Sequence, residues 1–417
     1  MAPSSKPPFP PAPQPAAVSK VAVIHCGSYR QEAVEEAVLR GISLLGGARR
    51  FVRPGETLLL KPNILAPDPP EKCVTTHPEV FRAVAKLLLA EGAKLSYGDS
   101  PAVGSMERAA AKCGIRDAAA ALEIAPADFS TGTEVFFEAG RQNKKFIIAQ
   151  GVLEADGVVS LPKLKTHGLE RVTGCVKNQF GCIPGLRKAE YHLRIPDALQ
   201  FARMLLDLNR LIAPRLYVMD GIRAMEGNGP RGGTPSALNV LLFSTDPIAL
   251  DAAVCRLIGL DPEHVPTVRY GEASGDGCWR EGQVAFLGDD LLQLRCPSFD
   301  VVRRPVRPYR RSAGAMERLL SNHLIARPVI EDSRCVRCGI CVKACPVRPK
   351  AVDWFDGDKR RPPRHDYPRC IRCYCCQELC PESAIALKVP PLRTWLDRGA
   401  EAWRRLRDRL HKGPSPW

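Results

Sequence analysis

The feature that most constrains this chain is a cysteine spacing that occurs twice towards its carboxyl end. In each copy three cysteines follow one another at intervals of three, and proline follows a fourth, giving the pattern C-x2-C-x2-C-x3-C-P. The two copies are Cys335, Cys338, Cys341 and Cys345, and Cys370, Cys373, Cys376 and Cys380. Nine of the 17 cysteines lie between Cys335 and Cys380, so this segment must fold around a dense group of thiols.

The spacing predicts iron–sulfur clusters with crossed ligands. Three cysteines at intervals of three can surround one cubane in a tight loop, whereas the fourth, expected to lead a short helix, turns away to the other copy's cubane. Pro346 and Pro381 bend the chain after the fourth cysteine and remove a backbone donor there. We therefore expect two [4Fe–4S] clusters. Their ligands would be Cys335, Cys338, Cys341 and Cys380 for one, and Cys370, Cys373, Cys376 and Cys345 for the other.

Disulfides and zinc are the alternatives for so many thiols. The first twenty residues are rich in Pro and Ala and lack an apolar segment, which predicts a disordered leader and a cytoplasmic protein with reduced thiols. Zinc ribbons place their C-x2-C pairs further apart and need neither the third cysteine nor the proline. Cys375 is one thiol more than two clusters take. A small buried hydrophobe is its simpler interpretation, and a redox-active or cluster-tuning thiol is the alternative.

The cysteine-rich segment closely resembles the bacterial two-cluster ferredoxins over about sixty residues. The resemblance implies a small α+β domain that binds both clusters. Two clusters in one module allow electrons to be relayed one at a time.

The longer part of the chain alternates apolar runs with amphipathic stretches. Strands are indicated by KVAVIHC, TLLLKPN and DGVVSLPKL, and helices by RQEAVEEAVLRGISLLGG, HPEVFRAVAKLLLAEGA and SMERAAAKCGIRDAAAAL. This alternation predicts an α/β fold with a mostly parallel sheet and flanking helices, followed by the small ferredoxin-like domain. The expected divisions are a leader (1–18), an α/β domain (19–300), a basic linker (301–328), a two-cluster ferredoxin domain (329–390) and a basic amphipathic helical tail (391–417).

Polar clusters follow several of the expected strands, in KPNIL, GDSPAVG, LPKLKTHGLE and the loop TGCVKNQFGCIPGLRKAEYH. Ligands of α/β folds gather at the carboxyl ends of strands, and unpaired ammonium groups are costly to bury. We therefore expect the cations to face a crevice that binds an anionic small molecule or cofactor, with an ion-pair network around ordinary loops as the alternative. The candidate binding residues are Lys61, Asn63, Asp99, Lys177, Asn178, Lys188 and His192. The candidate catalytic residues are Lys163, Lys165 and His167, the last as a general acid or base.

Carboxylates in the same stretches could counter these cations or hold a divalent metal. They are Asp99, Asp220, Glu226 and Asp246.

The same stretches resemble the prokaryotic family known as domain of unknown function 362, whose members are often fused to a two-cluster ferredoxin module. The motifs that carry the resemblance are KPN, THPEV, GDSP, LPKLKTH, TGCVKNQFGCIPG, MDGIRAMEGNGP and DPIALDA, between residues 55 and 255. The resemblance implies an iron–sulfur protein without an established reaction and a distant kinship to nickel-pincer lactate racemases.

The net charge of +15 is concentrated near the carboxyl end, where residues 301–417 hold 26 Lys and Arg against 12 Asp and Glu. Proline interrupts these basic runs, and no stacking aromatic residues in a sheet pattern accompany them, which argues against nucleic-acid binding. A basic rim that recruits an acidic redox partner protein, or that balances the negative charge of the clusters, is the favoured interpretation. For the tail, docking on the protein itself or on a partner is simpler than contact with an anionic membrane surface, which is the alternative.

The sequence as a whole predicts an iron–sulfur redox protein. It would relay electrons through two [4Fe–4S] clusters to an α/β domain that binds an anionic ligand, and could act as an oxidoreductase. The alternative is a carrier or maturation factor that serves another enzyme and has no turnover of its own. A redox-sensing regulator is a third class, but no helix-turn-helix pattern accompanies the cysteines.

Overall fold

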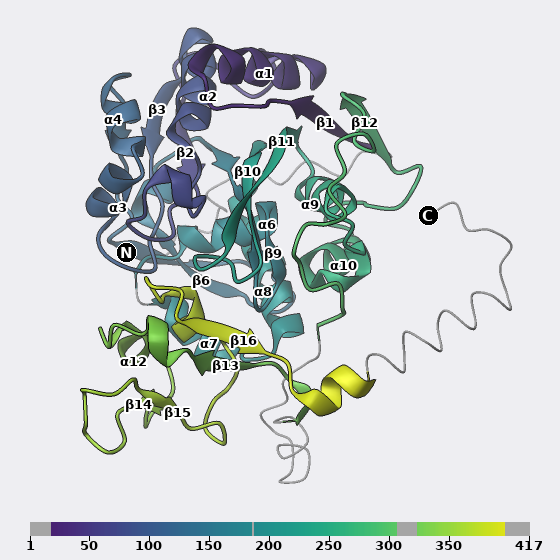
Figure 1. The fold of residues 1–417 in the computed structure, drawn as a ribbon. Helices are drawn as coiled ribbons and strands as arrows, with labels where there is room; N and C mark the ends of the chain where they lie inside the picture. The colour runs from purple at the N-terminus through teal and green to yellow at the C-terminus, as the bar shows by residue number, and fades with distance from the viewer. Residues whose placement is uncertain (1–17, 186, 307–322, 397–417) are drawn as a thin grey trace, which may run out of the picture. The chain divides into compact units, whose positions relative to one another are not determined.

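The computed structural model describes residues 18–185, 187–306 and 323–396, which form two compact units (Figure 1). The first unit ends at Val306 and the second begins at Arg307. No helix in the described part of the chain is long and apolar enough to cross a bilayer. Most of the expected leader and tail and the centre of the expected linker lie outside the described residues, at 1–17, 397–417 and 307–322.

The first unit is built on a ten-stranded sheet in the order β12-β1-β11-β10-β7-β2-β3-β4, with β8 beside β10 and β9 beside β8. Pairing is parallel except where β11 meets β1 and β10 and where β9 meets β8. The mostly parallel α/β fold is confirmed. The strands are β1 Ser19–His25, β2 Thr57–Pro62, β3 Lys94–Tyr97, β4 Ala125–Pro126, β7 Gly157–Leu161, β8 Lys163–His167, β9 Arg171–Thr173, β10 Leu216–Glu226, β11 Thr234–Ser244 and β12 Val284–Gly288; β5 Gly132–Phe136 and β6 Lys145–Ala149 form a separate hairpin.

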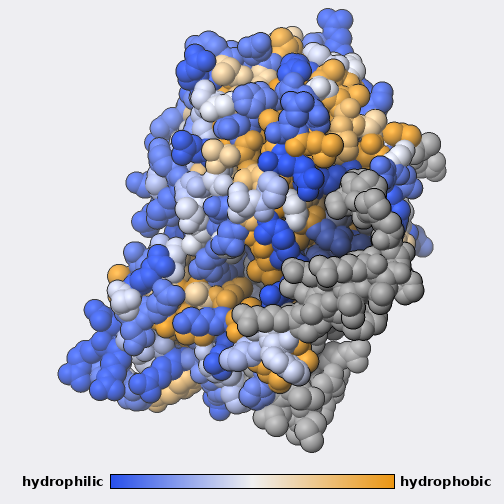
Figure 2. Space-filling model, turned by 45° about the vertical axis from the view of Figure 1, so that its right-hand side comes forward, coloured by the Kyte–Doolittle hydropathy of each residue, from blue (hydrophilic) through white to orange (hydrophobic). Residues whose placement is uncertain are grey.

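Helices cover both faces of this sheet. The successive residues Ala22, Val23 and Ile24 of β1 are all buried, although neighbouring side chains in a strand point to opposite faces. Helix α1 packs against β1, β11 and α2, and α9 also packs against β1 and β11. The surface seen in Figure 2 is mostly hydrophilic, with apolar residues in smaller patches. The helices are α1 Gln31–Leu44, α2 Pro78–Ala90, α3 Met106–Lys112, α4 Ile115–Ala120, α5 Gln150–Leu153, α6 Cys175–Asn178, α7 Arg187–Arg194, α8 Ala198–Ile212, α9 Pro247–Leu257 and α10 Pro266–Ala273.

One expected helix is broken in two. The stretch SMERAAAKCGIRDAAAAL forms α3 and α4, with an interruption between Lys112 and Ile115. Gly114 has a φ of 78°, a left-handed conformation that a right-handed helix cannot contain and that glycine adopts without steric penalty. Glycine therefore ends the first helix even though the apolar pattern continues through it.

In its described residues the second unit contains two small antiparallel strand pairs, the short helices α12 and α13, and further helical residues at 391–396, so the predicted α+β architecture is confirmed. One half supplies a strand, a cysteine loop, a helix and a strand, and the other half repeats this order. The elements are β13 Arg327–Ile330, α12 Ile340–Ala344, β14 Val352–Asp353, β15 Arg364–His365, α13 Cys375–Glu378 and β16 Ile385–Lys388. β13 pairs with β16 and β14 with β15, so both strand pairs join one half to the other through backbone hydrogen bonds.

The expectation that the fourth cysteine of each copy leads a short helix is wrong. Helix α12 ends before Cys345, and α13 ends before Cys380. Cys345 has extended backbone angles, φ −65° and ψ 117°. The proline that follows disfavours the helical conformation of the residue before it, so the helix has to finish first.

Candidate functional site

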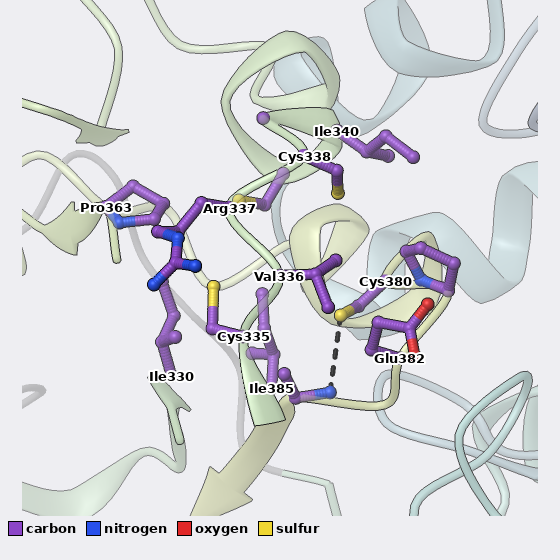
Figure 3. A pocket seen from close by; sticks show the side chains of 14 residues that line it. Ile330, Cys335, Val336, Arg337, Cys338, Ile340, Pro363, Cys380, Glu382 and Ile385 are labelled. Atoms are coloured by element: carbon purple, nitrogen blue, oxygen red, sulfur yellow. Dashed lines mark hydrogen bonds between the residues drawn. The ribbon is translucent and has the colours of Figure 1, made fainter. Parts of the chain in front are cut away.

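Four of the expected ligand cysteines line one cavity in the second unit (Figure 3). The side chains of Cys335, Cys338 and Cys380 extend towards it, and Cys341 completes the group. The cavity holds about 360 Å³ of empty space, part of which is open to solvent. Its remaining lining is mainly apolar and consists of Ile330, Val336, Gly339, Ile340, Pro363, Pro381, Ala384 and Ile385, with Arg337 and Glu382. The structure thus brings together the set that the spacing predicts for the first cluster.

The backbone around these cysteines suits an anionic iron–sulfur centre. Arg337 and Gly339, on either side of the second cysteine, both have left-handed backbone angles, with φ of 59° and 73°. Turns of this kind aim successive backbone N–H groups into a concavity, an arrangement that binds anions and many iron–sulfur centres. The N–H of Ala384 also donates a hydrogen bond to the Cys380 sulfur at 3.3 Å, dashed in Figure 3. The residues present therefore fit a cluster bound by four thiolates.

The pKa of Cys341 reflects its position among the expected ligands. Burial is the main reason that the pKa of this thiol rises to about 12; a backbone hydrogen bond from Val342 opposes the rise, and the neighbouring Cys380, Cys335 and Cys338 add to it. A thiol in this position releases its proton in exchange for a bound cation, because thiolate ligands must be deprotonated.

The second expected set also gathers in one place. Cys345 and Cys376 belong to a single buried cluster, against which Cys370 packs. Burial raises the pKa of Cys376 well above its usual value, and Cys373 and Cys370 are the neighbouring groups that contribute most after it. The charge of Cys345 adds to the same effect. All three cysteines that the spacing assigns to the cluster of Cys376 thus lie near enough to act on it, and so does Cys341 of the first set.

Two further polar side chains adjoin this second set. The Nε2 atom of His365 lies 3.5 Å from the Cys376 sulfur. The side chains of Cys375 and Cys373 share a hydrogen bond, which lowers the pKa of Cys373 and raises that of Cys375 well above its usual value. Cys375, the extra thiol of the sequence, is buried and points to an expected ligand.

In the first unit, the candidate residues at the end of β2 form one hydrogen-bonded network. The fully buried Lys61 places its Nζ 2.9 Å from Asp99 Oδ1 and 3.3 Å from Asn178 Oδ1. Asn63 donates to the same Asn178 oxygen at 3.0 Å. Lys165 joins through Asn63 Oδ1, which lies 2.7 Å from its Nζ. Five predicted residues from four segments are thus brought together.

Gly181 makes room for this network. A Cβ atom at this position would lie 1.7 Å from Asp99 Oδ1 and 2.9 Å from Lys61 Nζ. The second glycine of the loop TGCVKNQFGC is therefore needed, because any side chain there would collide with the Lys61–Asp99 ion pair. This close approach could not be read from the spacing of glycines in the sequence.

Lys163 belongs to a second polar group. Its Nζ lies 2.7 Å from Asp220 Oδ2 and 2.8 Å from the hydroxyl of Tyr29, which donates to Asp220 Oδ1 at 2.7 Å. The ring of Tyr29 stacks on His77 with centroids 3.6 Å apart. Burial lowers the pKa of His77 to about 4 and raises that of Tyr29 well above its usual value. Sequence reasoning did not single out Tyr29 or His77. Tyr29 follows an expected strand, and His77 begins an expected helix.

His167 lies at the end of β8, where its Nδ1 accepts hydrogen bonds from the N–H groups of Leu169 at 3.1 Å and Glu170 at 3.2 Å. The ring therefore closes the turn after the strand. Its Nδ1 is an acceptor, so the neutral imidazole carries its proton on Nε2.

The last three candidates occupy different surroundings. His192 stacks on Phe201 with centroids 4.5 Å apart, and Lys177 lies over the ring of Phe180 at 4.7 Å. Lys188 donates to the carbonyl of Ser100 beside the Asp99 network. Burial lowers the pKa of Lys188 to about 7.

The remaining carboxylates serve separate structural roles. Asp246 caps α9, accepting from the N–H of Ile248 at 2.8 Å, and Glu226 accepts from the N–H of Asp300 at 2.9 Å. Among the described residues, no three His, Cys, Asp or Glu side chains form a group that could hold a single metal ion. The buried lysines are instead compensated by individual partners: Lys61 by Asp99 and Lys163 by Asp220.

Comparisons with known proteins match the two compact units separately. The family model described as domain of unknown function (DUF362) matches residues 58–256, and a 4Fe-4S dicluster domain matches residues 321–384. A thylakoid-associated protein of Synechocystis sp. is 37% identical over 259 residues, which cover 62% of this chain and 80% of that protein.

A solved structure, the lactate racemase apoprotein of Thermoanaerobacterium thermosaccharolyticum, matches with a TM-score of 0.35 and 12% identity. The match covers 56% of this chain and 55% of that one, so it spans about half of each. The family model, the relative and the dicluster match together show that this chain belongs to the DUF362 family and carries an iron–sulfur domain of the 4Fe-4S dicluster type.

Proposed function

We propose that this protein is a cytoplasmic electron-transfer protein with two [4Fe–4S] clusters, which relays electrons to an α/β domain that binds an anionic small molecule or cofactor. The observation that carries the proposal is the cavity lined by Cys335, Cys338 and Cys341 from one loop and Cys380 from the other. Cys370, Cys373, Cys376 and Cys345 would bind the second cluster. Each cluster supplies one-electron transfer at a potential set by its surroundings.

The first cluster is the proposed point of contact with a redox partner protein. Cys338 is exposed, and Val336 beside it is 56% exposed. Arg337 is also exposed and donates to the carbonyl of Arg360, so the basic run around Arg360 lies next to the cavity. A positively charged rim favours a partner with an acidic surface and accelerates its docking at low salt.

The ligand of the α/β domain is proposed to bind at the strand ends that carry Lys61, Lys163 and Lys165. Two of these ammonium groups contact neutral side chains: Lys61 contacts Asn178, and Lys165 contacts Asn63. Oxygen atoms of an anion could replace such neutral acceptors without leaving the lysines unpaired. In this proposal Lys163, Lys165 and His167 would be the catalytic candidates of an iron–sulfur oxidoreductase.

A carrier or maturation role without turnover is the second candidate. It is favoured by the internal compensation of the buried lysines, since Lys61 and Lys163 each have a carboxylate partner within 2.9 Å and 2.7 Å. A domain whose cations are already paired needs no substrate to stabilise them. The two candidates share the clusters and differ only in whether the first unit binds a small molecule.

Iron and acid-labile sulfide analysis of anaerobically purified protein tests the clusters. We expect about eight iron and eight sulfide per chain and an EPR signal of reduced [4Fe–4S] centres after dithionite. Zinc without acid-labile sulfide would refute the proposal.

Mass spectrometry of small molecules released from the same preparation distinguishes the two candidates. A stoichiometric organic anion that is lost in Lys61→Met and Lys163→Met, with iron content unchanged, supports the oxidoreductase. Its absence from the wild-type protein supports the carrier.

A further inference from the structure

The two cysteine loops of the second unit follow the same backbone course, so they can be compared position by position. The residue before the second cysteine is left-handed in both, Arg337 with a φ of 59° and Arg372 with 58°. The residue after it is left-handed as well, Gly339 with 73° and Tyr374 with 63°. A non-glycine residue adopts this conformation uncommonly, and its recurrence at matched positions shows that the two loops share one template.

Backbone donors to the ligand sulfurs are also matched. The N–H of Ala384 donates to Cys380 at 3.3 Å, and the N–H of Ala351 donates to Cys345 at 3.4 Å. Both sulfurs belong to the fourth cysteine of a copy. These bonds therefore do not distinguish one cluster from the other.

Side-chain donors differ between the halves. The residue five positions before the first cysteine is Ile330 in one half and His365 in the other. Ile330 lines the first cavity with an apolar side chain, whereas His365 Nε2 lies 3.5 Å from the Cys376 sulfur. An iron-bound thiolate has no proton, so in this contact the imidazole N–H donates and the sulfur accepts.

We propose that His365 is a positioning residue that raises the reduction potential of the second cluster by donating a hydrogen bond to its ligand Cys376. Reduction adds negative charge that the ligand sulfurs share, and hydrogen bonds to sulfur stabilise that charge. The proposal rests on the two-cluster function above.

Exchange of the matched residues provides the test. EPR-monitored redox titration of the anaerobically purified full chain is carried out on the wild type, His365→Ile, His365→Gln and Ile330→His. His365→Ile is expected to lower one midpoint by about 59 mV, a tenfold change in the equilibrium of a one-electron couple, and to leave the other unchanged. His365→Gln keeps an N–H donor and should retain most of the wild-type potential. Ile330→His should raise the other midpoint.

His365 is not an expected ligand, so the iron and sulfide contents of its variants should match those of the wild type.

The inference is overturned if His365→Ile leaves both midpoints unchanged, or if it shifts both midpoints equally. If His365→Ile loses iron, Ile330→His decides, because it should raise the midpoint of the other cluster. A wild-type protein without two [4Fe–4S] centres would instead refute the proposed function.

Discussion

Cys341 and Cys380 come from different cysteine loops yet line the same cavity, and among the neighbouring groups that raise the pKa of the Cys341 thiol, Cys380 contributes most. This pairing is what the crossed ligand arrangement requires. It also means that the first cluster would join the two halves of the second unit.

Removing a crossing cysteine should therefore remove the cluster of the other loop. In Cys380→Ala we expect the iron content to fall from about eight to about four per chain, with the loss at the cluster of Cys335, Cys338 and Cys341. Iron analysis and EPR measure this. Cys296→Ala, in the first unit, is the control and should keep all the iron. Loss of the cluster that Cys370 and Cys373 bind would contradict the crossed arrangement.

Removing the iron should unfold the second unit and leave the first folded. Three of the six residues in the small buried core of the second unit are cysteines: Cys341, Cys345 and Cys376. Small domains that bury little apolar surface depend on metal for stability, and binding free energy becomes folding free energy. Calorimetry of the iron-free protein is expected to lose one transition and keep that of the first unit. Two unchanged transitions would show that the second unit folds without clusters.

Gly181→Ala should destabilise the first unit by breaking the Lys61–Asp99 pair. The added Cβ would lie 1.7 Å from Asp99 Oδ1, so the carboxylate or the loop has to move. Separating a buried ion pair leaves uncompensated charges and costs about 3–5 kcal/mol. Urea denaturation measures the change. Gly27→Ala is the matched control, because its Cβ would meet its nearest atom at an ordinary 3.7 Å, and an equal loss in both variants would exclude this mechanism.

Asp251 should make the first unit less stable as the pH rises from about 4 to about 7. Burial raises its pKa from 3.8 to about 7, outweighing the hydrogen bonds it accepts from the N–H groups of Cys175 and Val176. The folded state then binds a proton more tightly than the unfolded state, so the contribution is complete below pH 4 and is lost through pH 7.

Equilibrium unfolding at several pH values tests this against Asp251→Asn. The variant cannot ionise, so its free energy of unfolding should fall less than that of the wild type across the same pH range. Parallel profiles for both proteins would exclude Asp251 as the source.

Local pattern was sufficient to predict much of this molecule. The alternation of strands and helices gave the fold class, and cysteine spacing alone identified the four residues that line the cavity. The helix prediction failed at Gly114 because a single left-handed residue ends a helix even where the apolar pattern continues. Cys345 was expected to lead a helix, but α12 ends before it because Pro346 disfavours the helical conformation of the preceding residue.

The partners of the polar residues could not be predicted, because they are set by strand register. Lys163 meets Asp220 since β8 and β10 pair at these residues. The hydroxyl of Tyr29 reaches the same pair from the segment after β1. Spacing identifies which residues end the strands, but only the order of strands in the sheet decides which of them touch.

The phenol of Tyr29 has a consequence for how relatives of this chain diverge. It contacts Lys163 and Asp220 through its hydroxyl and His77 through its ring, so segments distant in sequence meet at one side chain. A replacement at any one of these four positions would leave the other three ill-matched. We therefore expect these four residues to be replaced together or retained together across related chains.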